Sequence, residues 1–486
     1  MEAKNMIFII SDEHAREITG CYGNTIIKTP NIDRLAKSGT RFSNAYTNCP
    51  VCKPARASLA TGRFVHEIRN WDNAHPYFGE TKGWGHRLLD EGHNVTAIGK
   101  LHYLSSKDYT GFSDEINTLN AKDGKGDLLG LIRDKNMVER KAAKQLAEQA
   151  GPGDSSYIRY DVNTAQEAVR WLKEEAPKHA SQPWVLFIGF VLPHFPLIAP
   201  QKYFDMYPVK SLPWPRMYYK DEHVRHPAVE SLSNVMGYNR HFTTEKVQVA
   251  RSAYFGMISM LDYHIGQVLK AMTENGHSDT TRVIYTSDHG DNMGHRGMWG
   301  KSVMYEESVG IPMIIAGPDV PSGNVVKSPV SLVDCYQTIL ESSGLDLTED
   351  EEYNMPGHSL LRIASGERLK RTIFSEYHAF GSSAAFYMIR NGHWKYTHYI
   401  GEAPELYNLA TDPYEMKNLG ESAIHQAIIQ DCEEKLCNIV DPEFVNSQAF
   451  ADQKIMIEAN GGVEKILALD EIGYSPPPDT SVPIAN

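Results

Sequence analysis

The segment CKPAR at residues 52–56 combines a cysteine, a proline and an arginine at a spacing that suits a reactive site. Pro54 fits the first turn of a helix, where its missing N–H group costs nothing. Cys52 would then stand at the helix N-terminus, where partial positive charge stabilises an anion, and Arg56 would follow one turn later. Because a free cysteine is more often a buried structural residue, the segment alone leaves both interpretations open.

Two acidic segments follow predicted strands that lie far apart in the chain. They are SDEH at residues 11–14 and SDHGD at residues 287–291. Adjacent carboxylates at a strand end suit a hard divalent cation, which prefers oxygen ligands. Each segment alone could equally be a solvated loop. Because open α/β sheets bind ligands at the carboxyl ends of their strands, the two segments together favour one shared metal site.

Short apolar runs alternate with amphipathic segments along most of the chain. The predicted strands are 6–10, 94–98, 184–191, 282–286 and 312–316. The predicted helices are 30–37, a segment that Asp161 would cap, 244–273 and 331–343. The run at 184–191 is continuously apolar, as expected for a strand buried on both faces. This alternation predicts an α/β fold with a large, mostly parallel or mixed sheet sandwiched by helices.

The pattern changes after about residue 365. A hairpin around Gly392, a strand at 405–409 and a helix at 424–439 predict a small antiparallel sheet with a helix. The chain ends in a Pro-rich stretch that cannot form regular structure. We therefore predict three parts, namely a catalytic domain at 1–365, an α+β subdomain at 366–440 and a C-terminal tail at 441–486.

Composition narrows the classes of function. The 486 residues carry 48 lysines and arginines against 61 aspartates and glutamates, a net charge of −13, which argues against a nucleic-acid partner. The six cysteines show no disulfide-framework spacing, and the C-x-x-C at 49–52 has no second pair to complete a zinc site. We find no signal-peptide pattern and no apolar run of about 20 residues, so we expect a cytoplasmic protein without membrane contact.

The C-x-P-x-R pattern at 52–56, followed by Thr61-Gly62, resembles the signature of the sulfatase family. Other segments resemble this family in order and spacing: GCYG at 20–23, TPNIDRL at 29–35, GKLH at 99–102, PHFP at 193–196, SDHG at 287–290 and ELYNL at 405–409. The resemblance covers nearly the whole chain. It implies an alkaline-phosphatase-like fold and a formylglycine-dependent sulfatase, similar in its motifs to choline-sulfatase-like and arylsulfatase members.

The resemblance also implies roles for individual residues. Cys52 would be oxidised to formylglycine by a maturation enzyme, and the formylglycine would attack a sulfate monoester to form a covalent sulfoenzyme intermediate. One divalent metal is implied, with calcium expected and manganese as the alternative. Its ligands would be Asp12, Glu13, Cys52, Asp288 and His289. Arg56 would fix the formylglycine. The groups around the sulfate would be Lys100, His102, His194 and Lys301, with Asn73 as a further substrate contact.

Acid–base roles follow from residue type. Histidine suits proton transfer because its ordinary pKa lies near about 6.5. His194, together with Lys301, is the candidate acid for the leaving oxygen, and His102 is the candidate base.

Two departures from the family pattern leave an alternative open. Glu13 stands where many sulfatases have aspartate, and His289 stands where many have asparagine. The Asp-His pair at 288–289 resembles both choline sulfatases and the related phosphonate monoester hydrolases. A phosphonate monoester hydrolase or phosphodiesterase, or an enzyme that accepts both esters, is therefore the alternative. Lys100 and His102 favour the sulfatase. A binding protein that hydrolyses nothing is less favoured, because the reactive residues are intact.

Contacts beyond the sulfate group are harder to assign. Residues 110–160 are predicted to form a loop or lid, and substrate pockets often lie on such loops. The aromatic stretch 203–219, which includes Trp214, could hold a quaternary ammonium such as choline by cation–π contact, although such clusters are more often packing. The tail resembles the extension by which choline-sulfatase-like enzymes pack between subunits, which implies a homodimer or homotetramer.

Overall fold

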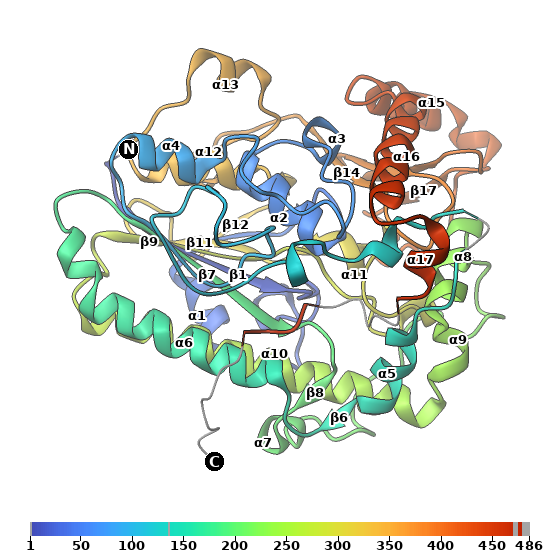
Figure 1. Ribbon diagram of the computed structural model, residues 1–486, viewed down its shortest axis with the longest axis horizontal. Helices are drawn as coiled ribbons and strands as arrows, with labels where there is room; N and C mark the ends of the chain where they lie inside the picture. Colours follow the sequence, from blue (N-terminus) through green and yellow to red (C-terminus); the bar gives the residue numbers. More distant parts are fainter. Residues whose placement is uncertain (1, 135–136, 470–474, 479–486) are drawn as a thin grey trace.

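The computed structural model describes residues 2–134, 137–469 and 475–478. Its centre is an eight-stranded mixed sheet (Figure 1). The strands are β1 (Asn5–Asp12), β2 (Gly39–Phe42), β4 (Val95–Lys100), β5 (Asp114–Leu119), β7 (Val185–Pro193), β9 (Thr281–Ser287), β11 (Met313–Ala316) and β12 (Asn324–Val326). They follow the order β12-β2-β11-β9-β1-β7-β4-β5. The strands from β9 to β5 are mutually parallel, whereas β11 runs antiparallel to both β9 and β2.

The first strand shows why the central runs are continuously apolar. β1 lies between β7 and β9 and is parallel to both. Ile7 and Ile9 enter the core on one face of the sheet, and Phe8 and Ile10 enter the core on the other. Since side chains alternate between the two faces, a strand covered on both sides must be apolar at every position.

Helices cover both faces of the sheet (Figure 1). One face packs against α1 (Pro30–Ser38), α6 (Ser156–Glu174) and α10 (Thr244–Glu274). The other face packs against α2 (Cys52–Thr61), α4 (Trp84–Asp90), α12 (Asp334–Ser342) and α14 (Leu360–Ala364). On α6, Ala165, Ala168 and Leu172 are buried against the sheet, and Val169, which the helical pattern places on the same side, is partly buried. The predicted α/β fold is therefore confirmed.

The predicted helix cap at Asp161 is wrong. Helix α6 begins earlier, and the hydroxyl of its N-cap residue Ser155 accepts the backbone N–H of Ile158 at 3.2 Å. Asp161 lies inside the helix and is fully buried. Its carboxylate accepts the backbone N–H groups of Val191 at 2.9 Å and Leu192 at 2.8 Å. The partners lie about thirty positions further along the chain, so a local pattern could not reveal them.

A smaller antiparallel sheet follows in the C-terminal region. Its strands are β14 (Thr372–Tyr377), β15 (Phe386–Asn391), β16 (Trp394–Tyr399) and β17 (Glu405–Asn408), in that order. The predicted hairpin joins β15 and β16 at Gly392, whose φ of 60° is left-handed and suits glycine. Helix α15 (Gln426–Cys437) packs on this sheet. The small sheet is confirmed, while the boundaries at residues 365 and 440 stay predictions.

Short elements form the connections. The short strands are β3 (Ala45–Tyr46), β6 (Gly151–Pro152), β8 (Ile198–Ala199), β10 (Gly310–Ile311) and β13 (Val330–Ser331). The short helices are α3 (Val65–Ile68), α5 (Lys141–Gln149), α7 (Gln201–Phe204), α8 (Pro227–Met236), α9 (Tyr238–His241), α11 (Glu306–Val309) and α13 (Glu349–Asn354). The segment 110–160 contains β5, α5 and the start of α6, so it is not a single loop as expected. Such short elements show too little periodicity to predict.

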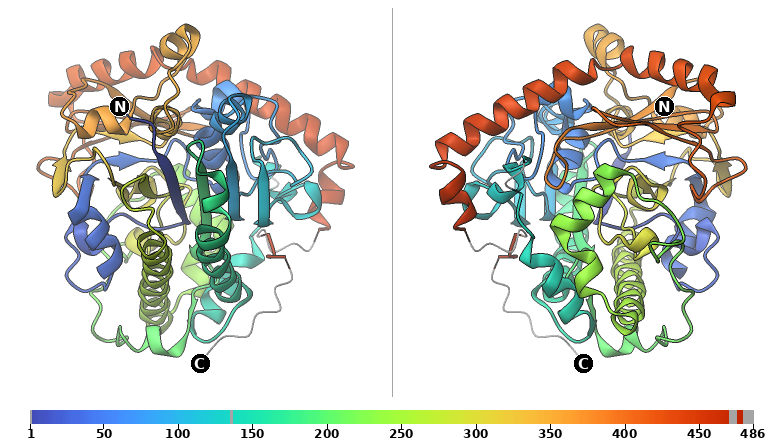
Figure 2. Two further views of the ribbon diagram at one scale, coloured as in Figure 1. Left: turned by 90° about the vertical axis from the view of Figure 1, so that its left-hand side faces the viewer. Right: turned by 90° about the vertical axis from the view of Figure 1, so that its right-hand side faces the viewer.

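The C-terminal tail begins with helices α16 (Pro442–Ala459) and α17 (Val463–Leu467), which lie on the outside of the molecule (Figure 2). Gln453 on α16 donates to the Asp72 carboxylate and to the His378 carbonyl, both at 2.7 Å. Ser475–Pro478 has no regular structure, as predicted for the Pro-rich stretch, whose other residues lie outside the described part. None of the described helices has the length and apolar character to cross a bilayer.

Candidate active site

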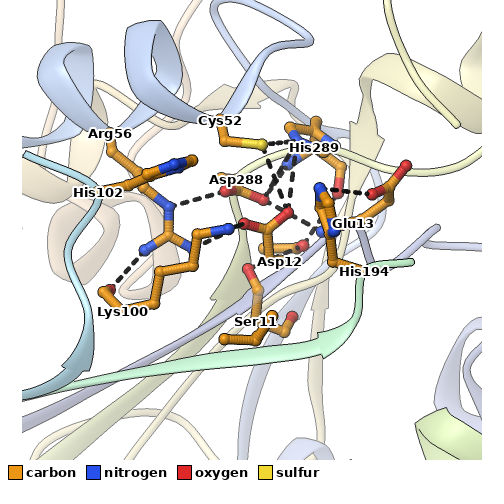
Figure 3. Close-up of polar contacts among 12 residues, drawn as sticks. Ser11, Asp12, Glu13, Cys52, Arg56, Lys100, His102, His194, Asp288 and His289 are labelled. Carbon is orange, nitrogen blue, oxygen red and sulfur yellow. Dashed lines mark hydrogen bonds and ion pairs between the residues drawn. The ribbon is translucent and has the colours of Figure 1, made fainter. Parts of the chain in front are cut away.

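Four adjacent strands of the large sheet deliver charged side chains to one edge (Figure 3). β9 is followed by Asp288, β1 ends at Asp12, β7 is followed by His194, and β4 ends at Lys100. All four side chains are at least 95% buried. These strands are parallel neighbours, so their carboxyl ends meet at the same place although the residues are far apart in sequence.

Cys52 is the first residue of α2, as the proline at position 54 predicted. Its side chain is 1% exposed. The sulfur lies 3.1 Å from His289 Nε2 and 3.6 Å from Asp12 Oδ1. The N-terminus of α2 therefore meets the acidic strand ends, and Figure 3 shows Cys52 directly beside them.

Arg56, one turn further along α2, joins the strand ends together. Its Nε donates to Asp288 Oδ2 at 2.8 Å, and its Nη1 donates to the Lys100 carbonyl at 2.7 Å. A third contact, Nη2 to Asp12 Oδ2, is 3.5 Å long. Burial would raise the pKa of the Asp12 carboxyl, but Lys100, His194 and Arg56 together hold this pKa well below its ordinary value. Asp12 is therefore ionised.

Glu13 lies beside two basic side chains of the site, those of Lys301 and His194. Its Oε2 accepts from Lys301 Nζ at 3.0 Å and lies 3.4 Å from His194 Nε2. Its Oε1 is buried and has no hydrogen-bond partner. Burial raises the pKa of Glu13 well above its ordinary value, although Lys301 opposes this. The carboxyl thus has an unused acceptor that an additional cation would satisfy.

Two of the histidines have a defined tautomer, since a backbone carbonyl can only accept. His289 Nδ1 donates to the Gly290 carbonyl at 3.0 Å, which leaves the Nε2 lone pair directed toward Cys52. His194 Nδ1 likewise donates to the Phe195 carbonyl at 2.8 Å. Burial, and then the charge of Lys301, hold the pKa of His194 well below its ordinary value.

His102 contacts a residue that the sequence did not indicate. Its Nε2 lies 3.1 Å from the Ser475 hydroxyl, and its Nδ1 is buried without a hydrogen-bond partner. Ser475 is fixed from the other side, because its carbonyl accepts from the Tyr157 hydroxyl at 2.8 Å. Burial, with Lys100 and Lys53, lowers the pKa of His102 well below its ordinary value. No local signal marks Ser475, since it lies in the irregular Pro-rich stretch.

A cavity of ≈ 60 Å³ opens onto these groups. Among the predicted residues that line it are Glu13, Cys52, Asn73, Lys100, His102, His194 and Lys301. It is also lined by Asp127, Arg140 and Tyr157, which lie in the predicted loop or lid at 110–160, and by Phe195, Tyr238, Phe380 and Ser475, to which the sequence assigned no role. The aromatic stretch 203–219 contributes no residue to this cavity. Instead, Trp214 stacks on Tyr219 with ring centroids 6.0 Å apart, so these rings form no cation–π site in this cavity.

The predicted metal ligands come together. Ligand atoms of Asp12, Cys52, Asp288 and His289 lie within 4.8 Å of one another, and a second such group joins Asp12, Glu13 and His194. The unpartnered Glu13 Oε1 and the Nε2 lone pair of His289, which faces Cys52, both fit a bound cation. Carboxylate oxygens dominate the set, which suits a hard divalent ion. The one nitrogen donor is also compatible with manganese.

Two family sequence models match the chain. The sequence model of the family described as Sulfatase matches residues 4–345. A second model, N-sulphoglucosamine sulphohydrolase C-terminal, matches residues 294–441. The chain is 30% identical to arylsulfatase K of Danio rerio over 469 residues, which cover 90% of this chain and 84% of that protein. It is 29% identical to choline-sulfatase of Rhizobium meliloti strain 1021 over 432 residues, which cover 86% and 82%.

Solved structures share the fold. A phosphonate monoester hydrolase of Agrobacterium radiobacter superposes with a TM-score of 0.74 at 23% identity, covering 92% of this chain and 96% of that one. A 2-O GAG sulfatase superposes with a TM-score of 0.71 at 23% identity, covering 93% and 94%. The family model spans most of the chain, including the strand ends and helix start that build the site. The chain therefore belongs to the sulfatase family and is a sulfuric ester hydrolase.

Proposed function

We propose that the protein hydrolyses sulfate monoesters with a formylglycine derived from Cys52, beside one divalent metal ion. The observation that carries this proposal is the meeting of Cys52 with Asp12, Asp288 and His289 within 4.8 Å. Position 52 lies at the start of α2, beside the acidic ends of the sheet strands. A nucleophile at this position would therefore lie next to a cation held by those acids. We further propose calcium as the metal, with manganese as the alternative.

The state of Cys52 supports its modification. Burial, and then the Asp12 carboxylate, raise the pKa of the Cys52 thiol to about 11. The thiol therefore stays protonated at neutral pH. An unmodified Cys52 would be a poor nucleophile in this state, because the nucleophilic form of cysteine is the thiolate. A hydrated formylglycine would supply a hydroxyl nucleophile at the same position, and a bound metal would lower the pKa of that hydroxyl.

The cationic side chains would hold the sulfate group. Lys100 and Lys301 line the same cavity as Cys52, and both form ion pairs with acids of the site. A sulfate ester resists attack because its oxygens carry negative charge. Fixed positive groups in a buried site offset that charge without any reorganisation. Arg56 is bound to Asp288 and Asp12, so we assign it to positioning the start of α2.

We assign proton transfer to His194 and His102. Both imidazoles are neutral in the free chain because burial lowers their pKa. An anionic sulfate group beside His194 would raise that pKa again, so its Nε2 would gain a proton when the substrate binds. It could then protonate the leaving oxygen, with Lys301 nearby. His102 would act as the base that regenerates the resting site.

Kinetic measurements decide whether the protein prefers a sulfate monoester or a phosphodiester as its substrate. One preparation is assayed with an aryl sulfate and with an aryl phosphodiester that have the same leaving group. We expect kcat/KM to be larger for the sulfate. A preference of orders of magnitude for the phosphodiester would assign the protein to the alternative, a phosphonate monoester hydrolase or phosphodiesterase.

The nucleophile is tested by mass spectrometry of the peptide that contains residue 52. Protein from a host with the maturation enzyme should carry formylglycine there. Cys52→Ala should abolish aryl sulfate turnover without loss of folding, since alanine fits a buried helix start. Full activity with unmodified cysteine would disprove the assignment.

A further inference from the structure

A second cavity of ≈ 610 Å³ lies apart from the active site. Among the described residues, it shares no lining residue with the active-site cavity. Its walls come from residues 16–26, residues 213–216, helix α10 and residues 413–414. Its volume falls in the range of small-molecule sites, about 300–1,000 Å³. Nothing in the proposed sulfatase chemistry uses this cavity.

Arg251 on α10 is an unusual residue to line such a cavity. It is 4% exposed. Its Nη1 donates to the Met293 carbonyl, while its Nε is buried without an acceptor. Within the described part of the chain, no carboxylate pairs with it. Burial lowers the pKa of Arg251 to about 10, although Glu17 opposes this. Burying a guanidinium that forms no ion pair is costly, and an anion in the cavity would offset that cost.

Two further donors in the wall lack acceptors. They are Nε1 of Trp214 and Nε of Arg216, and both atoms are buried. By contrast, no buried oxygen of a described lining side chain lacks a hydrogen-bond partner. Unused donors without unused acceptors indicate a ligand that accepts hydrogen bonds.

The charged side chains that line the cavity also favour a ligand that accepts hydrogen bonds. Four arginines line the cavity against three carboxylates. Those carboxylates are already paired: Arg216 donates to Glu17 at 2.9 Å and to Glu307 at 2.7 Å, and Arg16 lies 2.5 Å from Glu306. The positive surplus therefore falls on Arg251 and on Arg41, whose guanidinium lies 4.8 Å from the Tyr22 ring and forms no ion pair with a described carboxylate.

A cation is a poor occupant of the same cavity. Glu17, His295 and Glu307 bring ligand atoms within 4.8 Å of one another, as a metal site would require. However, Arg216 occupies both carboxylates, and Arg296 also donates to Glu307 at 3.0 Å. A metal ion or a quaternary ammonium would have to displace or face these guanidinium groups.

We propose that this cavity binds a small monoanionic molecule, with its carboxylate or sulfonate-like group directed to Arg251. The rings of Tyr22, Trp214, Phe255 and Tyr414 also line the cavity, so the ligand would carry a flat apolar body. A single negative charge matches the excess of one arginine over the carboxylates of the lining, whereas a dianion would exceed it.

Isothermal titration calorimetry with benzoate and benzenesulfonate tests this proposal, with neutral benzamide as the isosteric control. We expect both anions to bind at least about tenfold more tightly than benzamide, because a charged hydrogen bond is lost in the amide. Arg251→Gln should weaken binding of both anions about tenfold or more. Lys270→Gln removes one exposed charge from the same helix and should leave the affinity unchanged.

Two controls keep the outcome unambiguous. Unchanged aryl sulfate turnover by R251Q would show that this variant is folded. If R251Q does not fold, Arg41→Gln replaces it, since Arg41 is only partly buried and should weaken binding about threefold. Lys301→Met removes a charge from the proposed active site and should leave benzoate binding unchanged. Equal affinities for benzoate and benzamide, or binding that is lost in K301M but kept in R251Q, would overturn the proposal.

Discussion

At the scale of single residues, the site depends on groups whose charge is set by their neighbours. Glu13 is the clearest case, because one oxygen is paired with Lys301 and the other has no partner. Burial raises its pKa well above the ordinary value, so the chain alone favours the protonated form. A bound cation would reverse this preference and stabilise the carboxylate.

This contrast predicts the behaviour of Glu13→Gln. Glutamine resembles the protonated carboxyl, so the metal-free variant should unfold at nearly the same temperature as the metal-free wild type. Added calcium or manganese should stabilise the variant less, since a tenfold loss of metal affinity removes about 1.4 kcal/mol of linked stability. Calorimetry after chelation and after metal addition measures both. An equal rise in melting temperature for the two proteins would exclude Glu13 as a ligand.

Asp161 is a second residue whose proton depends on folding. Burial raises its pKa to about 7, although the N–H groups of Val191 and Leu192 oppose this. An unfolded aspartate titrates near about 3.9. Between these two values the folded chain keeps a proton that the unfolded chain has released. Its contribution to stability is therefore fully present below about pH 4 and is lost as pH rises toward about 7.

Asp161→Asn should remove this dependence on pH. The free energy of unfolding of the wild type should fall relative to that of the variant as pH rises from about 4 to about 7, by at most about 1.4 kcal/mol per pH unit. Urea unfolding of both proteins at several pH values isolates the difference, because the other titrating groups cancel. A difference that is constant with pH, or that changes in the opposite direction, would contradict the raised pKa.

At the scale of elements, the long regular segments were predictable and the short ones were not. Helix α10 was expected at 244–273 and spans Thr244–Glu274, since its length gives a clear periodicity and Thr243 caps it. The start of α2 at Cys52 followed from Pro54. By contrast, β5 and α5 were missed, because tertiary contacts rather than local pattern stabilise such short elements.

Helix α1 shows how one element completes another. Its N-cap residue Thr29 makes no side-chain cap. Instead, Asp262 on α10 accepts the backbone N–H groups of Asn31 at 3.0 Å and Ile32 at 2.8 Å. Asp262 is 2% exposed, so water cannot replace it.

Asp262→Ala should therefore destabilise the protein by about 1–3 kcal/mol, the cost of leaving buried donors unsatisfied. Glu274→Ala, at the exposed end of the same helix, is the matched control and should change the free energy of unfolding by less than about 0.5 kcal/mol. Chemical denaturation of the two variants gives the comparison. Equal effects would show that the cap is unimportant.

At the scale of the whole molecule, the tail is the feature with an open role. Helix α16 lies on the outside of the molecule, and the hydrogen bonds of Gln453 hold it there. Yet Phe444 and Ile455 on this helix are 57% and 64% exposed. Exposed apolar side chains on a terminal helix are compatible with the predicted contact between subunits.

The homodimer or homotetramer is tested by changing only these exposed positions. The double variant Phe444→Lys and Ile455→Lys should lower the mass measured by analytical ultracentrifugation, since lysine is disfavoured at interface cores. Ile424→Lys, at an 89% exposed position outside the tail, should leave the mass unchanged. A wild type that sediments as a monomer, or a double variant with the wild-type mass, would disprove the predicted role of the tail.

The sequence by itself determined the fold class, the family and the residues that gather at the site. Apolar runs and helix signals are local, so the parallel strands could be placed and Asp12 and Asp288 could be assigned to one edge, whereas Cys52 was assigned to the same site by the resemblance to the sulfatase family. The tertiary structure alone decided which groups meet. Ser475 reaches His102, Asp161 binds the end of β7, and the Nε of Arg251 is buried without an acceptor. Burial and pairing depend on residues that lie from about thirty to several hundred positions apart, and no local pattern contains that information.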